Sequence, residues 1–363
     1  MDKRWARRPL DPVMEMHVPR LYGSTPTLFG APLAEDATQL GDADVAFIGI
    51  PWRAPAPDSR AGSAGANFES TLLTPAFFRT SSMRYGGYLP ELDVDVFDVF
   101  RLADFGDVQP HGDMAGILAG VEQHVKAALD AGCSVVTMGG NAGPSSYAVL
   151  KAIADGCAGV AVLNLDAHSD NSEGEWQDDD PRAPRWGSTW ALRILGLPGV
   201  DPSQYFHFGL RGPRNDSGVF DRFAARGVPR ENIVTYRELK AARRHDYDAW
   251  AEGFAADVVR RASKLWIAVD GDVLDLSSNP EWADEPLGPR AEEVIQVVYE
   301  ACKAAGPERF AGLSFMAVPH DAPGMHAICL YVLLYALAGI AASQPATAPG
   351  PDREHATAKA PES

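Results

Sequence analysis

Short apolar runs that alternate with longer amphipathic segments constrain the fold of this chain more than any other feature of its sequence. The runs are rich in β-branched and aromatic residues, which is typical of buried strands. They occupy residues 44–50, 94–100, 134–138, 159–165, 205–209, 233–236, 264–269 and 310–315. The amphipathic segments have helical periodicity and occupy residues 114–131, 144–154, 247–262, 289–305 and 323–342. This alternation predicts an α/β fold with a mostly parallel sheet of about eight strands and helices on both faces.

The two ends of the chain differ in composition from the region between them. Residues 1–40 are rich in proline, glycine and charge and predict an extended arm, whereas residues 344–363 have the composition of a disordered tail. No linker-like segment interrupts the alternation, so we expect a single domain over residues 41–343. We expect a cytoplasmic protein, because the N-terminus lacks the apolar stretch of a secretion signal and the apolar run at 328–342 is short for a membrane span.

The charge balance of the chain limits its partners. Its 363 residues include 32 lysines and arginines and 49 aspartates and glutamates, for a net charge of −17. Such a surface repels nucleic acid and anionic membranes, so we expect neither as a partner. It is compatible with a small cationic substrate. The four cysteines form no C-x-x-C pair, and we expect them to be reduced and structural.

Three polar clusters directly follow predicted strands. Residues 139–143 read Gly-Gly-Asn-Ala-Gly, residues 166–170 read Asp-Ala-His-Ser-Asp, and residues 270–275 read Asp-Gly-Asp-Val-Leu-Asp. The carboxyl ends of parallel strands meet at one edge of a sheet, where ligands bind in folds of this class. The sequence therefore predicts one site assembled from three distant segments.

Two of these clusters bring carboxylates together. Asp166, His168 and Asp170 alternate along an extended segment, so their side chains point the same way, and Asp270 and Asp272 repeat that spacing. Four carboxylates in a poorly solvated cleft repel one another unless a cation neutralises them. Oxygen ligands with one imidazole suit manganese, nickel or a similar divalent ion. The alternative is that these aspartates only cap turns, which is harder to reconcile with two such motifs than with one.

These motifs, in this order, resemble the ureohydrolase family, the group of arginases and agmatinases. The resemblance is carried by 47–65 (FIGIPWRAPAPDSRAGSAG), 102–108 (LADFGDV), 166–170 (DAHSD), 209–212 (GLRG), 268–275 (AVDGDVLD) and 321–327 (DAPGMHA). It implies a three-layer α/β/α, arginase-like fold. It also implies a centre of two metal ions whose bridging hydroxide attacks a guanidinium carbon.

The resemblance assigns a role to each carboxylate. Asp166 and Asp270 would bridge the two metals. His168 and Asp272 would complete one metal site, and Asp170 would belong to the other.

The chain departs from the family at three positions. The histidine of the family's G-G-D-H-S motif is Ala142, the histidine of its H-G-T motif is Trp186, and the acid of its G-x-D-x-V-E motif is Ala317. In the family these residues bind metal, transfer protons and hold the guanidinium group. His320 or His207 could supply an imidazole from another position. His207 lies within an apolar strand and is expected to be a core histidine, so His320 is the better candidate.

Three such losses predict a non-catalytic subunit of a guanidine or biguanide hydrolase complex. The pattern is similar to that of the two-subunit metformin hydrolases of this family, and it implies an active ureohydrolase paralogue as partner in a trimer or hexamer. We expect nickel or manganese as the metal, with one ion or none in this chain. One alternative is a self-sufficient hydrolase with a rebuilt pocket for guanidine, a biguanide or an agmatine-like substrate. Another is a binding module without an enzyme partner, which does not explain why five ligand residues remain.

Overall fold

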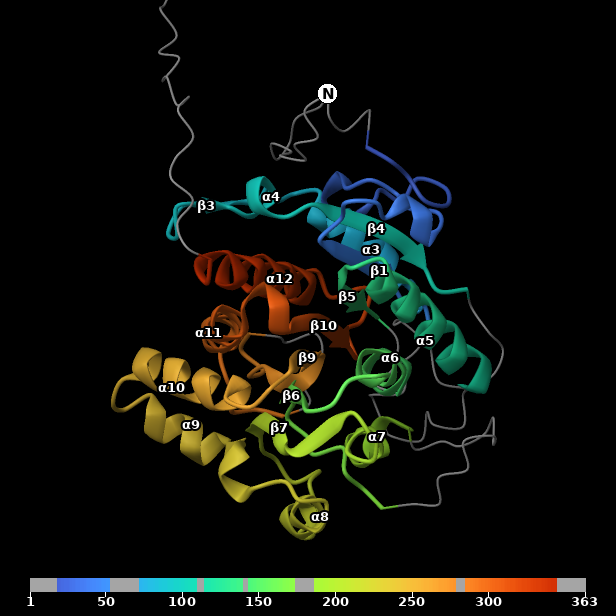
Figure 1. Ribbon diagram of the computed structural model, residues 1–363. Helices are drawn as coiled ribbons and strands as arrows, with labels where there is room; N and C mark the ends of the chain where they lie inside the picture. The colour runs from blue at the N-terminus through green and yellow to red at the C-terminus, as the bar shows by residue number, and fades with distance from the viewer. Residues whose placement is uncertain are drawn as a thin grey trace, which may run out of the picture.

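A parallel sheet of eight strands runs through the centre of the molecule (Figure 1). The computed structural model describes residues 18–52, 72–109, 114–139, 143–173, 186–278 and 285–344. The strands are β1 (Val45–Gly49), β4 (Leu102–Asp107), β5 (Ser134–Met138), β6 (Val160–Leu165), β7 (Val200–Leu210), β8 (Ile233–Thr235), β9 (Lys264–Asp270) and β10 (Phe310–Met316). Their order is β4-β1-β5-β10-β9-β6-β7-β8, and every neighbouring pair is parallel. The predicted parallel sheet is therefore confirmed.

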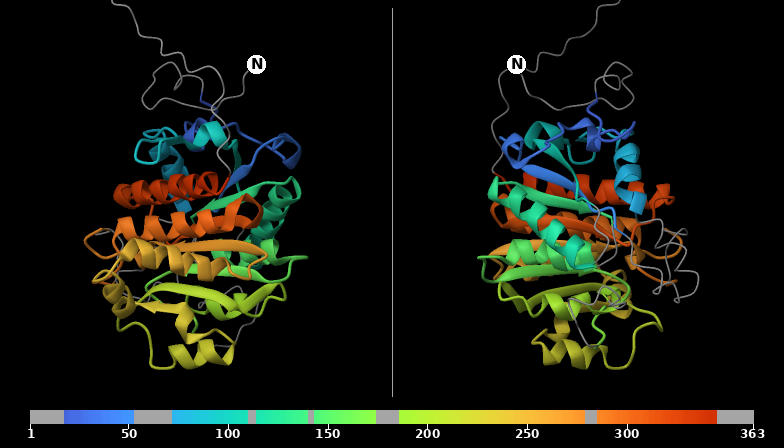
Figure 2. Two further views of the ribbon diagram at one scale, coloured as in Figure 1. Left: turned by 60° about the vertical axis from the view of Figure 1, so that its left-hand side comes forward. Right: turned by 90° about the vertical axis from the view of Figure 1, so that its right-hand side faces the viewer.

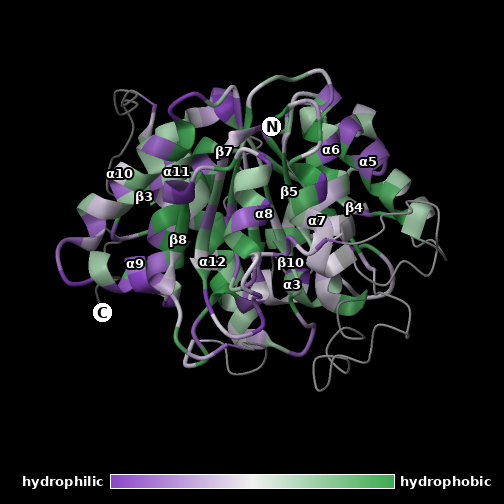
Figure 3. Ribbon diagram, turned by 90° about the horizontal axis from the view of Figure 1, so that it is seen from below, coloured by the Kyte–Doolittle hydropathy of each residue, from purple (hydrophilic) through white to green (hydrophobic). Residues whose placement is uncertain are grey.

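Helices cover both faces of the sheet, as the two views of Figure 2 show. One face packs against α3 (Thr74–Ser82), α9 (Tyr236–Ala242), α10 (Tyr247–Val259), α11 (Ala291–Arg309) and α12 (Pro323–Ala342). The other packs against α5 (Met114–Asp130), α6 (Val149–Ala154), α7 (Trp186–Ile194) and α8 (Val219–Ala225). Figure 3 shows apolar strands at the centre and polar positions on the outer helices. This three-layer α/β/α arrangement confirms the predicted fold class.

The central strands are mostly apolar because helices cover both of their faces. β6 and β10 are buried at every position, as expected in an all-parallel sheet. α12 is the one helix in the described part of the chain that is long and apolar enough to span a membrane. However, 67% of its apolar window is buried inside the protein, where it packs against α11. Its composition is therefore explained by a place in the core.

The strand predicted at residues 94–100 is wrong. Only Val94–Asp95 is extended, as β3, which pairs with β2 (Tyr88–Leu89) in a separate two-stranded sheet. The next residues form the short helix α4 (Val96–Val99), because the Asp95 carboxylate caps it by accepting a hydrogen bond from the backbone N–H of Phe97. The strand that pairs with β1 is instead β4, which the sequence analysis recognised only as the motif LADFGDV.

Four short helices were not predicted, namely α3, α7, α8 and α9. They have seven to nine residues, which is too few turns for a clear helical period in the sequence. Residues 18–40, predicted as part of an extended arm, place Leu28 and Phe29 in the core at 1% and 3% exposure. The domain boundaries remain predictions, since residues 1–17 and the predicted tail after Gln344 lie outside the described residues.

A buried ion-pair cluster joins α3 to β4, and we call it the Arg79 cluster. It consists of Arg79, Asp104 and Asp107. The guanidinium donates to both carboxylate oxygens of Asp104, at 2.7 and 2.8 Å, and to Oδ1 of Asp107 at 2.5 Å. Arg79 and Asp104 are fully buried, and the guanidinium carbon lies 4.8 Å from the ring centroid of Phe47. The backbone N–H of Leu28 also donates to Asp104, so this cluster holds the N-terminal segment against the sheet.

Candidate metal centre

The candidate site lies where β6 and β9 end. These strands are neighbours, and Leu165 pairs with Val269 in their register. The residues that follow, Asp166 and Asp270, therefore leave the sheet side by side. The tight turns after both strands are closed by their own carboxylates: Asp166 accepts from the backbone N–H of His168 at 2.7 Å, and Asp270 from that of Asp272 at 3.0 Å. These turns direct the later side chains of each motif back over the sheet edge.

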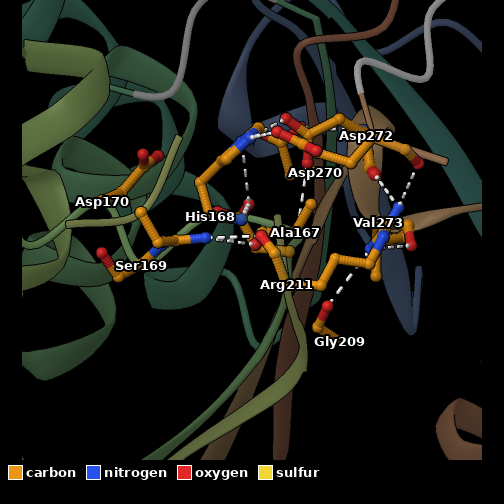
Figure 4. A network of polar contacts seen from close by, with 12 residues as sticks. Ala167, His168, Ser169, Asp170, Gly209, Arg211, Asp270, Asp272 and Val273 are labelled. Atoms are coloured by element: carbon orange, nitrogen blue, oxygen red, sulfur yellow. Dashed lines mark hydrogen bonds and ion pairs between the residues drawn. The ribbon is translucent and has the colours of Figure 1, made fainter. Parts of the chain in front are cut away.

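The structure brings all five predicted ligand residues together in two groups that share one carboxylate, that of Asp166. Figure 4 labels the other members, His168, Asp170, Asp270 and Asp272. We call Asp166, His168 and Asp272 the histidine half, and Asp166, Asp170 and Asp270 the carboxylate half. Within each half, one ligand atom from each residue lies within 4.8 Å of the others. Asp166 belongs to both groups, as expected of a bridging ligand, whereas Asp270, also expected to bridge, belongs to the carboxylate half alone.

The histidine half is organised around the Nδ1 atom of His168. This nitrogen lies 2.8 Å from Oδ2 of Asp272 and 3.9 Å from Oδ1 of Asp166. The other oxygen of Asp272 accepts a hydrogen bond from the backbone N–H of Ala167 at 3.2 Å. His168 and Asp272 are 9% and 7% exposed, so this half is buried but not fully closed off from solvent.

The carboxylate half depends on an unusual backbone at Asp170. Its φ of 44° lies in the left-handed region, which aspartate tolerates better than most residues. The indole N–H of Trp190 donates to Oδ2 of Asp170 at 2.6 Å, and the backbone N–H of Ala191 donates to its carbonyl at 3.1 Å. α7 therefore positions Asp170 through both its backbone and one side chain.

Burial raises the pKa of three carboxyl groups in the site. Desolvation, with repulsion from the neighbouring aspartates, raises the pKa of Asp166 and of Asp270 well above the usual range. Desolvation raises the pKa of Asp170 to about 7, although His168 and the Trp190 indole act in the opposite direction. Without a cation, these groups hold protons that an exposed aspartate releases at much lower pH.

His168 and Asp272 form the one oppositely charged pair among the five ligand residues. Burial acts to lower the pKa of His168, but the adjacent Asp272 carboxylate outweighs it and raises that pKa to about 9. Burial likewise opposes ionisation of Asp272, yet His168 and its hydrogen bonds bring the pKa of Asp272 below the usual range. The five residues thus supply one positive charge for four carboxylates.

A divalent cation fits this arrangement. Oδ2 of Asp166 is buried and has no hydrogen-bond partner, although Asp166 belongs to both halves of the site. A buried carboxylate oxygen without a partner costs free energy that a cation would recover. Four carboxylates and one imidazole are also the donor set that manganese and nickel accept. The five residues that would hold the ion or ions are Asp166, His168, Asp170, Asp270 and Asp272.

The three altered positions lie around this cluster to different extents. Ala142 lies outside the described residues. Trp186 is the first residue of α7, four residues before Trp190 in the same helix. Ala317 follows β10, the neighbour of β9, and has a φ of 52° in the left-handed region, where a residue with a Cβ is strained. Ala317 thus lies at the same edge of the sheet as the carboxylates.

The two histidines considered as substitutes have other surroundings. His207 is fully buried in β7, where Nε2 donates to the Asp166 carbonyl at 3.0 Å and Nδ1 faces Tyr205 and Asn164. Burial lowers the pKa of His207 to about 4, as expected for a neutral core histidine. His320 packs against the ring of Phe77 with 5.0 Å between centroids and belongs to neither half of the site.

Three residues that support the five candidate ligands were not predicted from the sequence. Glu285 is 4% exposed, and its Oε1 lies 3.4 Å from Nε2 of His168. Arg211 donates to the backbone carbonyls of Asp272, Val273 and Leu274 at 2.9–3.0 Å, as Figure 4 shows in part. Trp190 is the third. Arg211 belongs to the GLRG motif, which offered a signal, whereas Glu285 lies in an irregular loop where no spacing marks it.

The sequence matches the arginase family over residues 43–318. It is 27% identical over 294 residues to the proclavaminate amidinohydrolase of Streptomyces clavuligerus, which covers 78% of this chain and 83% of that enzyme. It is also 30% identical over 153 residues to the agmatinase of Bacillus anthracis, covering 41% of this chain and 47% of that enzyme.

Solved structures share the fold over most of their length. The structure of proclavaminate amidinohydrolase from Streptomyces clavuligerus gives a TM-score of 0.69 at 22% identity, covering 88% of this chain and 99% of that one. The formiminoglutamase of Trypanosoma cruzi, solved with Mn²⁺, gives 0.69 at 20% identity, covering 88% and 100%. The family match, the shared three-layer fold and the five converging ligand residues agree, and this chain belongs to the arginase family of ureohydrolases.

Proposed function

We propose that this chain is a subunit of a metal-dependent hydrolase of guanidine- or biguanide-type compounds, and that an active paralogue in the same complex performs the chemistry. The observation that carries this proposal is the uneven state of the site. All three residues of the histidine half are in place around Nδ1 of His168. The family's other imidazole ligand is Ala142, and its proton-transfer and guanidinium-binding positions are Trp186 and Ala317.

The retained residues explain what this chain could still contribute. When bound at such a site, a divalent cation activates water near neutral pH by lowering its pKa. The histidine half, His168, Asp272 and Asp166, would hold one ion. Bound to the native state alone, the ion would stabilise the fold even without turnover. Nickel and manganese both suit this donor set.

The altered positions support a loss of turnover in this chain. An alanine side chain at 142 or 317 has no atom that can bind a metal or pair with a guanidinium. Indole donates a hydrogen bond but cannot accept and release a proton near neutral pH. General acid–base assistance is worth about 10²–10⁴-fold in rate, so its loss alone would leave little activity.

A hetero-oligomer accounts for a subunit of this kind. Closed symmetric assemblies tolerate a diverged copy as long as the shared surfaces stay complementary. Two-subunit metformin hydrolases resemble this arrangement, and a trimer or hexamer with an intact ureohydrolase in the cytoplasm is the expected setting. The net charge of −17 favours a small cationic substrate at the level of the complex.

Co-expression tests the proposal. This chain, alone and together with a paralogue that retains the G-G-D-H-S, D-A-H-x-D and H-G-T motifs, is loaded with nickel or manganese and assayed on guanidine, a biguanide and agmatine. We expect activity from the complex and none from this chain alone. A complex whose paralogue carries alanine at the G-G-D-H-S histidine should be inactive. Turnover by this chain alone, or by that substituted complex, would overturn the proposal.

A second candidate is a self-sufficient hydrolase with a rebuilt pocket. The convergence of all four carboxylates favours it, because the carboxylate half keeps three oxygen ligands without the histidine. Metal analysis of the purified chain separates the two readings. Two tightly bound ions per chain, together with turnover of any of the three substrates, would support the second.

A further inference from the structure

We propose that Glu285 is a positioning residue that holds His168 in the orientation and tautomer required to bind a cation. The inference concerns the histidine half alone. It requires that a cation binds there, and it does not depend on whether this chain or its paralogue turns over substrate. No family motif in the sequence includes Glu285, which lies in the loop between β9 and α11.

The two ring nitrogens of His168 face different carboxylates. Nδ1 faces the ligand cluster, 2.8 Å from Asp272, whereas Nε2 faces Glu285, 3.4 Å from Oε1. A histidine that binds a metal through one nitrogen carries its proton on the other. With a cation at Nδ1, the proton therefore lies on Nε2, and the Glu285 carboxylate is placed to accept it in a hydrogen bond. Such a carboxylate fixes the ring orientation and raises its basicity as a ligand.

Glu285 is held in place by the segment that follows β7. The Arg211 guanidinium donates to the Glu285 carbonyl at 3.2 Å while it also donates to the carbonyls of Asp272 and Val273. One side chain thus ties the loop that carries Glu285 to the turn that carries Asp272. The loop cannot move away from the ligand turn without breaking either the bond to the Glu285 carbonyl or the bonds to Asp272 and Val273.

A glycine makes room for the carboxylate. Gly212 has a φ of 84°, and a Cβ built there would lie 2.2 Å from Oε2 of Glu285. A side chain at this position would be strained by its own backbone and would also displace Glu285. Gly288 makes the same kind of room for the Arg211 guanidinium, since a Cβ there would lie 2.7 Å from it. The segments 209–212 and 285–288 are therefore packed against each other. Their packing places the buried Glu285 carboxylate beside Nε2 of His168.

The burial of Glu285 indicates that its contact with His168 does more than fill space. Glu285 is 4% exposed, and a buried carboxylate without a positive partner is costly. Glu293, a buried glutamate elsewhere in the chain, is paired with Arg243. Glu285 instead meets an imidazole whose other nitrogen faces the ligand cluster. The arrangement is most favourable when the imidazole carries a proton on Nε2 in every state of the site.

The test measures metal binding by the full chain rather than activity. Chelator-treated protein is titrated with Ni²⁺ or Mn²⁺ by calorimetry, and the visible spectrum of the Co²⁺-loaded protein reports ligand geometry. We expect Glu285→Ala to weaken affinity about 10–100-fold, the usual loss for such an outer carboxylate, and to alter the Co²⁺ spectrum. Glu285→Gln keeps an oxygen that accepts from Nε2, so its affinity should lie between those of the wild type and Glu285→Ala.

The matched control is Glu300→Ala. Glu300 is also buried, at 8% exposure, but it bonds to Gln296 and Lys303 on α11. It should change neither metal affinity nor the Co²⁺ spectrum. Wild-type affinity in Glu285→Ala would overturn the inference, as would equal losses in Glu285→Ala and Glu285→Gln or a wild-type chain that binds no divalent ion. A melting temperature of the stripped Glu285→Ala protein at or above that of the stripped wild type shows that any loss of affinity is local.

Discussion

Two buried acidic clusters lie at the carboxyl edge of the same sheet, and they are neutralised in different ways. In the Arg79 cluster, one guanidinium from α3 bonds to Asp104 and Asp107. In the candidate metal centre, four carboxylates share one imidazole, and Oδ2 of Asp166 has no partner. Both clusters are largely buried, with a small part of Asp107 in the first and of His168 and Asp272 in the second reaching solvent. The first cluster has its positive partner within the chain, whereas the second has the donor set of a candidate cation site.

The protonation of the two clusters follows from that difference. Burial alone would lower the pKa of Arg79, but Asp104 and Asp107 outweigh it and raise that pKa further above its ordinary value. The Arg79 guanidinium therefore keeps its charge despite its burial. In the metal centre, burial raises the pKa of Asp166, Asp170 and Asp270. A divalent cation that bound there would displace the protons that these carboxyl groups hold.

The largest expected effect comes from removing the guanidinium group of Arg79. Arg79→Leu leaves two buried carboxylates without a partner, which should lower the free energy of unfolding by about 3–5 kcal/mol. Urea denaturation measures this loss. Arg101→Leu is the control, because Arg101 pairs with Asp42 and Asp44 at the surface and should cost at most about 1 kcal/mol. Similar losses in the two variants would show that burial does not distinguish these ion pairs.

The second effect comes from adding a divalent ion that binds at the candidate metal centre. A divalent ion at 100 to 1,000 times its Kd should raise the free energy of unfolding by about 2.7–4.1 kcal/mol. Asp166→Asn should abolish this gain yet leave the stripped protein as stable as the wild type or more so, because a neutral amide replaces a carboxyl whose ionisation burial opposes. Thermal denaturation with and without chelator measures both quantities.

Asp104→Asn is the opposite control for that experiment. It breaks the pair with Arg79, so the stripped protein should lose stability while the gain from metal is retained. If Asp166→Asn behaved in the same way as Asp104→Asn, the aspartates of the site would be structural turn residues rather than ligands.

The third effect is a pH dependence specific to the metal centre. The pKa of Asp170 in the fold is about 7, above its ordinary value, so the stripped fold holds a proton that the unfolded chain releases, and stability falls as pH rises from about 4 to 7. The pKa of His168 is raised to about 9, so its stabilisation is complete below about 6.5 and is lost as pH rises through 9. Both groups weaken the stripped protein as pH rises.

Metal binding should therefore stabilise the protein more at high pH than at low pH. Each proton released changes the free energy of binding by about 1.4 kcal/mol per pH unit within its titration range. The difference in melting temperature between loaded and stripped protein, measured from pH 5 to 9, should increase with pH. A difference that is constant or decreases would mean that the carboxylates are already ionised without metal.

Features that depend on a short stretch of sequence could be predicted, whereas features that depend on contacts between distant segments could not. The alternation of apolar runs was enough to predict the parallel sheet, because every strand in it is buried on both faces. The spacing of Asp166, His168 and Asp170 predicted that they share one site, but not for the expected reason. β6 ends at Leu165, and a turn closed by Asp166, with a left-handed backbone at Asp170, brings them together instead of an extended strand. The strand predicted at 94–100 failed because one capping aspartate, Asp95, overrides a run of β-branched residues.

The residues around the ligands could not be predicted in this way. Glu285 reaches His168 only because Arg211 and Gly212 fix an irregular loop whose path no periodicity describes. His207 could be predicted as a core histidine from its apolar strand, but its bond to the Asp166 carbonyl depends on the register of β6 and β7. Contacts of this kind depend on pairs of distant segments, and a single sequence does not reveal them.

The smallest effect concerns how the protein positions Asp170 without a positive partner. Trp190 donates a neutral hydrogen bond to Asp170 where Arg79 donates charged ones to Asp104. Trp190→Phe keeps an aromatic ring in this fully buried position but removes the donor, at a cost of about 1 kcal/mol. The pKa of Asp170 should then rise above about 7, because the indole bond lowers it.

The variant should lose metal affinity at pH 6.5 and recover most of it at pH 8.5, where the Asp170 carboxyl ionises without that hydrogen bond. Calorimetric titration at the two pH values measures this, with Trp250→Phe in α10, a residue of neither half of the site, as a control that should show no pH-dependent loss. An equal loss at both pH values would mean that Trp190 supports the site by packing, and that the carboxylate half does not depend on the hydrogen bond for its charge.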